Sequence, residues 1–210
     1  MSGPRRFLIK ICGITSPEDA ALAVAAGADA IGVNLWPGSK RHVDDATAHA
    51  VLAAVPAGVL KVGVFVDAPP AEVEARRRRL GLDRVQLHGD ERADAFADFG
   101  DAVIRAARVR DESTFDFEAG WSPGLWLYDA HAPGYGGSGV PAPWPLIARL
   151  GRRPFLLAGG LTPDNVAAGI AATRPDGVDV ASGVEADPRH KDAARLRRFI
   201  EEARAAARKL

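Results

Sequence analysis

Eight short apolar runs recur along the chain, and alanine-rich stretches with apolar residues at helical spacing separate most of them. The runs are almost continuously apolar, which is typical of parallel strands covered on both faces. Eight consecutive strand–helix units predict a closed (β/α)8 TIM barrel, an α/β fold, and an open doubly wound sheet is the alternative. The runs begin at Phe7, Ala30, Val59, Arg84, Ala102, Leu125, Phe155 and Gly177.

Local signals mark several of the helices between these runs. Ser16 and Pro17 predict a helix start and Gly27 its end, and Thr162 to Asp164 repeat the start signal later in the chain. The segment 111–124 contains proline, glycine and aromatic residues where the fifth helix belongs, so we expect a short or irregular connection there.

The bulk composition favours one soluble domain over residues 1–210. Lysine and arginine balance aspartate and glutamate at 27 each, which argues against a nucleic-acid partner, and no apolar stretch approaches the length of a membrane helix. The arginine run at 75–81 is interpreted as a solvated helix end. The single cysteine excludes an internal disulfide, and the N-terminus has no pattern typical of a secretion signal, so we expect a cytoplasmic protein.

Polar residues gather where the predicted strands end, which is where barrels of this class carry their chemistry. Glycines follow the last two strands, and their backbone N–H groups suit a phosphate, so they predict a phosphorylated small-molecule substrate rather than simple tight turns. A third glycine-rich stretch, 132–139, is interpreted as a loop that closes over the substrate. The residues at strand ends are Cys12, Arg41, Asp67, Gln86, His88, Arg108, Arg110, Asp129, Gly159, Gly160, Ser182 and Gly183.

Cys12 and Asp129 each have two interpretations from the residues alone. A solitary cysteine is commonly a small buried apolar group, but Cys12 ends the first strand at the expected site. Asp129 follows four apolar or aromatic residues, a setting in which a carboxyl group retains its proton and suits general acid catalysis. The alternative for Asp129 is a structural cap of the following loop.

Seven motifs, from about Leu8 to Val184, resemble the phosphoribosylanthranilate isomerase family of tryptophan biosynthesis in order and spacing. They read "KICGIT", "GSKRHV", "VGVFV", "VQLHGDE", "YDAHAPGYGGSG", "LAGGLTPDNV" and "GVDVASGVE". The resemblance implies a (β/α)8 barrel without cofactor or metal that performs an Amadori rearrangement. It also implies that Cys12 is the general base, that Asp129 is the general acid, and that Arg41 pairs with the anthranilate carboxylate. The same resemblance places phosphate near Gly159, Gly160, Ser182 and Gly183, and lines the site with Gln86, His88 and Asp179.

Lys10 is the first candidate for making the Cys12 thiolate available. It lies two residues earlier on the same predicted strand, so both side chains point to the same face. A nearby cation favours a thiolate, although pairing of Lys10 with an acid deeper in the barrel is equally consistent with the pattern.

Three other functions compete with this one. A histidine-pathway sugar isomerase resembles a design with aspartate as the first base, which Cys12 disfavours. Ribulose-phosphate epimerase needs metal-binding residues that the second run lacks. A non-catalytic barrel that binds a phosphorylated metabolite is the alternative outside enzymes, and the pattern leaves monomer and homodimer open.

Overall fold

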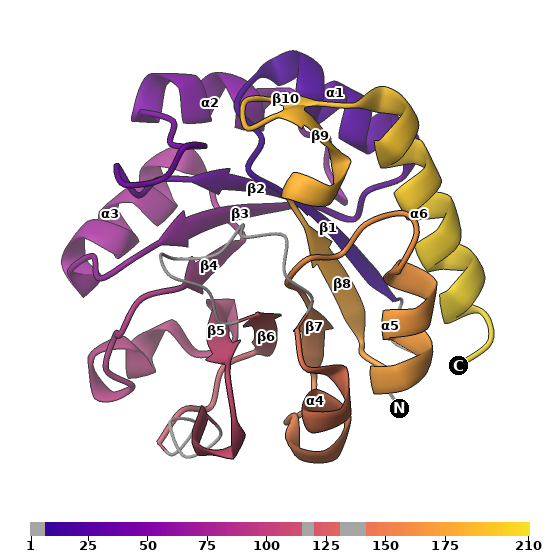
Figure 1. The fold of residues 1–210 in the computed structure, drawn as a ribbon. Coiled ribbons are helices and arrows are strands. Elements are labelled where there is room, and N and C mark those ends of the chain that lie inside the picture. Colours follow the sequence, from indigo (N-terminus) through magenta and orange to yellow (C-terminus); the bar gives the residue numbers. More distant parts are fainter. Residues whose placement is uncertain (1–6, 115–119, 131–141) are drawn as a thin grey trace.

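Eight parallel strands pair in chain order from β1 to β8, and pairing of β1 with β8 closes them into a barrel (Figure 1). This computed structural model describes residues 7–114, 120–130 and 142–210. The predicted closed barrel is confirmed. The strands are β1 (Leu8–Cys12), β2 (Ala30–Asn34), β3 (Leu60–Phe65), β4 (Arg84–Leu87), β5 (Val103–Val109), β6 (Leu125–Ala130), β7 (Phe155–Leu157) and β8 (Gly177–Val180).

Helices surround the barrel, and local chemistry explains where α1 begins and ends. The Ser16 hydroxyl accepts a hydrogen bond from the Asp19 amide at 3.1 Å, and Gly27 ends α1 in the left-handed region at φ 100°. Both signals are confirmed. The helices are α1 (Pro17–Ala26), α2 (Asp45–Ala53), α3 (Pro70–Leu80), α4 (Trp144–Leu150), α5 (Val166–Thr173) and α6 (Ala193–Ala207), with 3₁₀ helices η1 (Asp94–Ala102) and η3 (Ser182–Val184).

The start signal at Thr162 lies one turn before α5, whose regular helix begins at Val166. The Thr162 hydroxyl accepts from the Asp164 amide at 3.3 Å, the Asn165 side chain accepts from the Thr162 amide at 2.8 Å, and the Val166 amide donates to the Thr162 carbonyl at 3.1 Å. The segment 111–124 contains no α-helix in its described residues, as its composition predicts. The stretch 132–139, interpreted as a closing loop, lies outside the described residues.

The barrel interior is apolar at its middle and polar toward the C-terminal ends of the strands. Side chains at alternate positions form the inner core, which includes Val62, Ile104, Leu127 and Leu156, while the other face of each strand packs on the helices. Continuing the same alternation toward the strand ends places a polar group inside the mouth. That group comprises Lys10, Cys12, Gln86, His88, Asp129 and Asp179.

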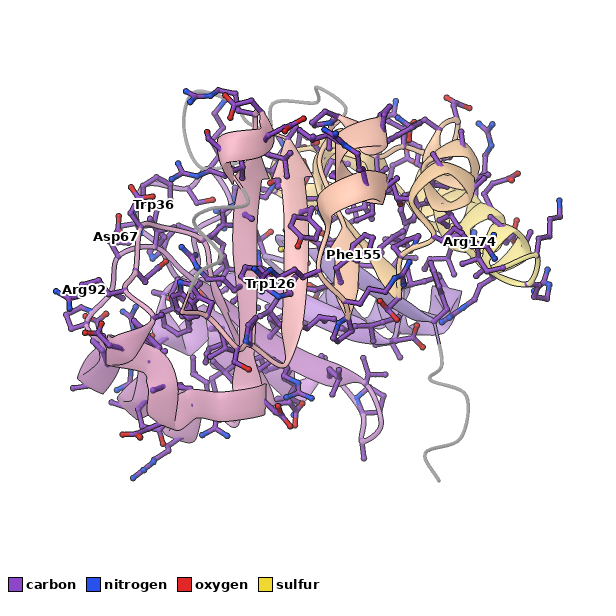
Figure 2. All side chains as sticks on the ribbon, turned by 90° about the horizontal axis from the view of Figure 1, so that it is seen from below. Trp36, Asp67, Arg92, Trp126, Phe155 and Arg174 are labelled. Atoms are coloured by element: carbon purple, nitrogen blue, oxygen red, sulfur yellow. The ribbon has the colours of Figure 1, made fainter. Side chains whose placement is uncertain are left out.

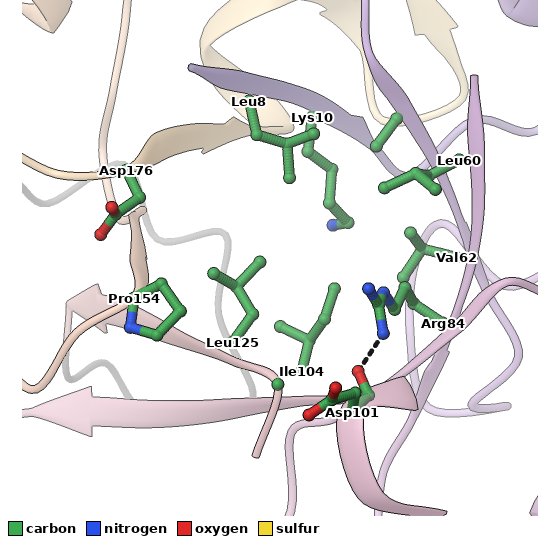
Figure 3. Close-up of a pocket in the computed structure, with 12 residues that line it drawn as sticks. Leu8, Lys10, Leu60, Val62, Arg84, Asp101, Ile104, Leu125, Pro154 and Asp176 are labelled. Carbon is green, nitrogen blue, oxygen red and sulfur yellow. Dashed lines mark hydrogen bonds between the residues drawn. The ribbon is translucent and has the colours of Figure 1, made fainter. Parts of the chain in front are cut away.

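A cavity of about 360 Å³ opens at the opposite, N-terminal end of the barrel (Figure 3). Apolar side chains such as Leu8, Leu60 and Leu125 line it, and Lys10 reaches it from the strand wall. Lys10 therefore lies between this apolar cavity and the polar mouth.

Loops that follow strands collect on one side of the molecule. Figure 2 shows Trp36, Asp67 and Arg92 there, and Arg174, which precedes β8, on the other side. A short antiparallel pair, β9 (Glu185–Asp187) and β10 (His190–Lys191), follows η3. Figure 1 shows this pair between the barrel and α1. It brings late residues of the chain to the end of β1.

Candidate active site

Lys10 and Cys12 lie side by side within the barrel. The ammonium of Lys10, with no exposed surface, donates to Asp179 Oδ1 at 2.8 Å, and the two residues are register partners across β1 and β8. A Cβ atom on Gly32 would lie 2.9 Å from the Cys12 sulfur and 3.1 Å from the Lys10 nitrogen. Glycine in β2 therefore leaves the space in which the thiol and the ammonium meet.

Burial and charge oppose each other at this pair. Burial lowers the pKa of Lys10, but the Asp179 carboxylate and Cys12 outweigh it and raise that pKa above its ordinary value. Desolvation raises the pKa of the Cys12 thiol although the residue keeps part of its surface exposed, and Lys10 only partly offsets this. The pair thus favours the charged ammonium, while burial of the sulfur works against its ionisation.

Asp129 lies near the end of β6 and faces His88 from β4. The His88 Nε2 atom is 3.5 Å from Asp129 Oδ2, and the Nδ1 atom is 3.0 Å from the Gln86 amide nitrogen. Both Gln86 and His88 are buried, and Nε2 has no hydrogen bond within the described residues. The three side chains form a row that ends at the Asp129 carboxyl group.

Gly159 packs directly against Asp129. Its φ is 81°, and a Cβ atom there would lie 2.8 Å from Asp129 Oδ1. The same oxygen accepts from the Ala130 amide at 2.7 Å. The loop after β7 thus helps to position the carboxyl group of β6.

Arg41, from the loop after β2, forms a bidentate pair with Glu185 of β9. Its Nε atom donates to Oε1 at 2.7 Å and Nη2 donates to Oε2 at 2.8 Å. Lys191 of β10 donates to the same Oε1 at 2.8 Å and to the Cys12 carbonyl at 2.8 Å. One carboxylate therefore holds two cations beside the end of β1.

A cavity of about 460 Å³ lies between the loops after β7 and β8. Gly160, Ser182 and Gly183 line it, while Gly159 faces Asp129 instead. Arg195 and Arg198 of α6 line its outer side, and Arg198 pairs with Asp164 at 2.6 Å. The cavity is thus bordered by glycine loops and by cationic side chains.

Several charged residues near the site were not predicted from the sequence. Glu185 ends the last motif but had no assigned role, and Lys191 follows that motif and reaches the site because β9 and β10 fold back. Arg195 and Arg198 belong to a helix with no motif. Of the other strand-end residues, Asp67 accepts from the Asp90 amide at 2.6 Å and Arg108 pairs with Asp90 at 2.6 Å. Asp90 thus links the loops after β3 and β4 to the end of β5.

Within residues 7–114, 120–130 and 142–210, no cluster of three or more histidine, cysteine or acidic side chains is arranged to hold a metal ion. Across the same residues, no helix combines the length and apolarity needed to cross a membrane.

These features define a class: (β/α)8-barrel enzymes with titratable side chains inside the C-terminal mouth and a glycine-lined cavity beside them. A family model described as N-(5'phosphoribosyl)anthranilate (PRA) isomerase matches residues 9–202. The chain belongs to that family, and the resemblance predicted from its motifs is confirmed.

Individual relatives cover nearly the whole chain. An N-(5'-phosphoribosyl)anthranilate isomerase of Geobacter sulfurreducens is 45% identical over 198 residues, which is 93% of this chain and 98% of the relative. A structure of monomers of the dimeric isomerase from Thermotoga maritima is 33% identical, with a TM-score of 0.83 over 95% of this chain and 99% of that one. A third relative, a phosphoribosyl anthranilate isomerase in complex with reduced 1-(o-carboxyphenylamino)-1-deoxyribulose 5-phosphate, is 34% identical, with a TM-score of 0.82 over the same shares.

Proposed function

We infer that the chain isomerises N-(5'-phosphoribosyl)anthranilate to 1-(2-carboxyphenylamino)-1-deoxyribulose 5-phosphate in tryptophan biosynthesis. It is an intramolecular aldose–ketose isomerase. We propose that residues 1–210 act as one catalytic domain, because the family model extends from the first barrel strand into the last helix.

The observation that carries this function is the placement of a thiol and a carboxyl group inside one barrel mouth, Cys12 on β1 and Asp129 on β6. Asp129 protonates the ring oxygen of the ribose, and the C1'–O bond breaks to give a protonated imine. The imine acidifies the C2' proton, which the Cys12 thiolate removes. The resulting enolamine tautomerises to the ketone, so the reaction needs two proton-transfer groups and no redox step.

Lys10 supports the ionisation of Cys12 in this proposal. Its ammonium lies beside the sulfur and stabilises negative charge there, while Asp179 keeps the ammonium in place at 2.8 Å. Asp179, expected to line the substrate, thus has a defined contact with Lys10. Both possibilities that the sequence left open for Lys10 are therefore combined in one arrangement.

Substrate binding is assigned to two groups at the mouth. Arg41 pairs with the anthranilate carboxylate, because Glu185 orients the planar guanidinium group of Arg41. Gly160, Ser182 and Gly183 bind the phosphate through their backbone N–H groups beside the cavity that they line. Gly159 supports this site from the side of Asp129.

In this proposal, Gln86 and His88 orient the side chain of Asp129. They do not bind the phosphate or the anthranilate carboxylate of the substrate. Their row of contacts ends at the carboxyl group, with His88 nearest to it. Such an arrangement orients a proton donor toward the substrate.

The chemistry of the reaction bears on the cofactors, partners and location of the enzyme. Two proton transfers require no cofactor or metal, and the partner is a phosphorylated small molecule rather than nucleic acid or membrane. A base that must remain a free thiol suits a reducing compartment, so we propose a cytoplasmic location. We propose monomer or homodimer as the working assemblies, since the isomerase of Thermotoga maritima is described as dimeric and monomers generated from it have been crystallised.

The test is turnover of freshly generated phosphoribosylanthranilate, followed by the decay of its anthranilate fluorescence. We expect decay proportional to enzyme concentration and formation of the ribulose product. A protein that binds the reduced product analogue without turnover would instead be a non-catalytic metabolite-binding barrel. Turnover of the histidine-pathway ribonucleotide alone would identify the related sugar isomerase.

A further inference from the structure

Lys191 is a buried lysine that no motif of the sequence points to. Its side chain is 1% exposed, and its ammonium donates to the Cys12 carbonyl at 2.8 Å, to the Ala181 carbonyl at 3.3 Å and to Glu185 Oε1 at 2.8 Å. A buried ammonium is costly unless acceptors and an opposite charge compensate for it. The fold therefore maintains a positive charge directly at the residue that bears the thiol.

Glu185 compensates for this charge only in part, because it is shared. Its two oxygens accept three hydrogen bonds from two cations, Arg41 and Lys191, and its side chain is 5% exposed. The charged groups around Cys12 and Lys191 come from several elements. They are Lys10 on β1, Asp19 on α1, Asp179 on β8, Arg41 after β2, and Glu185 and Lys191 on the β9–β10 pair.

The contacts of the two ammonium groups differ in how fully they are balanced. Lys10 and Asp179 pair with each other, whereas Glu185 is shared between Arg41 and Lys191. Asp19 accepts from the backbone amide of Lys191 and not from its ammonium. Loss of the Lys191 ammonium would therefore remove a cation beside Cys12, and a neighbouring cation favours the ionised form of a thiol.

We propose that Lys191 is a positioning residue for catalysis, which holds a positive charge beside Cys12 and stabilises its thiolate, while Glu185 fixes Lys191 and Arg41 together. This inference rests on the proposed function, in which Cys12 is the base. The hydrogen bond from the Lys191 ammonium to the Cys12 carbonyl keeps this positive charge beside Cys12. The same carboxylate thus connects recognition of the substrate at Arg41 with ionisation of the base.

The electrostatics of the two groups agree with this arrangement. Desolvation raises the pKa of the Cys12 thiol, and Lys191 is among the groups that lower it. Burial lowers the pKa of Lys191, and Glu185 and Cys12 offset that effect only in part. Removal of either partner therefore changes the ionisation of the other.

The chain has one cysteine, so alkylation by iodoacetamide across a pH series, followed by mass spectrometry, reports Cys12 alone and needs no substrate. We expect Lys191→Met to raise the apparent thiol pKa and to slow alkylation at pH 7 by about tenfold. Lys191→Gln keeps an amide donor for the Cys12 carbonyl but no charge, and we expect the same shift. Lys209→Met, at an exposed position, should match the wild type.

Glu185→Gln provides a test of opposite sign. This substitution leaves Arg41 and Lys191 without their shared carboxylate, so alkylation of Cys12 at pH 7 should become faster than in the wild type. Circular dichroism and resistance to proteolysis verify that the variant is folded. Loss of packing alone would shift the Lys191 and Glu185 variants in the same direction. Opposite shifts in folded proteins therefore support the charge argument.

Turnover separates this inference from the proposed function. We expect both Lys191 variants to lower kcat about tenfold at neutral pH with little change in KM. Wild-type alkylation profiles in both Lys191 variants would overturn the inference, and so would a shift in Lys191→Met that Lys191→Gln abolishes. If Cys12→Ala retained full turnover, the assignment of the base would fail, whereas the alkylation series would still measure the effect of Lys191 on the thiol.

Discussion

The imidazole of His88 lies against the carboxyl group of Asp129, with 3.5 Å between Nε2 and Oδ2. This separation is slightly longer than a hydrogen bond, and the other ring nitrogen is already held by Gln86 at 3.0 Å. Catalytic hydrogen bonds are often long before substrate binds and shorten in the complex. In the proposed mechanism, we therefore expect His88 to orient Asp129 once the substrate is bound.

His88→Ala should lower kcat by about ten- to a hundredfold and change KM less, because it removes a group that orients the acid. His88→Gln, which returns an N–H donor near Nε2, should recover part of the loss. Steady-state fluorescence kinetics measure both, with His49→Ala on the exposed face of α2 as the control. A raised KM with wild-type kcat would mean that His88 contacts the substrate instead.

Cys12→Ala and Asp129→Asn should each lower kcat by about two decades or more, since each removes one proton-transfer group. The reduced product analogue should still bind to both variants, because the phosphate loops and Arg41 are unchanged. Turnover assays and calorimetric titration of the analogue test the two parts separately. A variant with kcat like the wild type would refute the role of the substituted residue.

Arg41→Ala should raise KM by about tenfold, because it removes a charge-assisted fork for the anthranilate carboxylate. Arg41→Lys keeps the charge but not the fork, so it should recover only part of the affinity. Arg78→Ala, on the exposed side of α3, serves as the control. An unchanged KM in Arg41→Ala would assign the carboxylate to another cation.

Glu185 should make stability depend on pH below neutrality. Burial raises the pKa of its carboxyl group, but hydrogen bonds from Arg41 and Lys191 outweigh burial and leave that pKa below its ordinary value. A lowered folded-state pKa contributes stability that is fully present above the unfolded value, about 4.3, and is lost as pH falls through the folded value.

Urea unfolding of the wild type and of Glu185→Gln at a series of pH values measures this contribution. The difference in free energy of unfolding between the two should be constant from pH 7 to about pH 5.5 and should shrink as the pH falls further. A difference that stays constant down to pH 3 would show that ionisation of Glu185 does not stabilise the fold.

The order of strands and much of the local structure were predictable because they depend on neighbouring residues. Ser16 caps α1 and Gly27 ends it through contacts within a few positions, and both are present as predicted. The alternation of side chains along a strand likewise places Lys10 and Cys12 on one face. The Thr162 signal also forms its local contacts, and the regular helix α5 begins one turn later, at Val166.

The sequence by itself determined the eight-strand pattern, the family and the acid and base expected at the strand ends, since these are readable from local periodicity and motifs. Only the tertiary structure decided which charges surround the base. Glu185 lies 144 positions from Arg41, and Lys191 lies 179 positions from Cys12. Barrel closure and the β9–β10 pair bring them together, because the pairing of distant strands, and not any local preference, sets those distances.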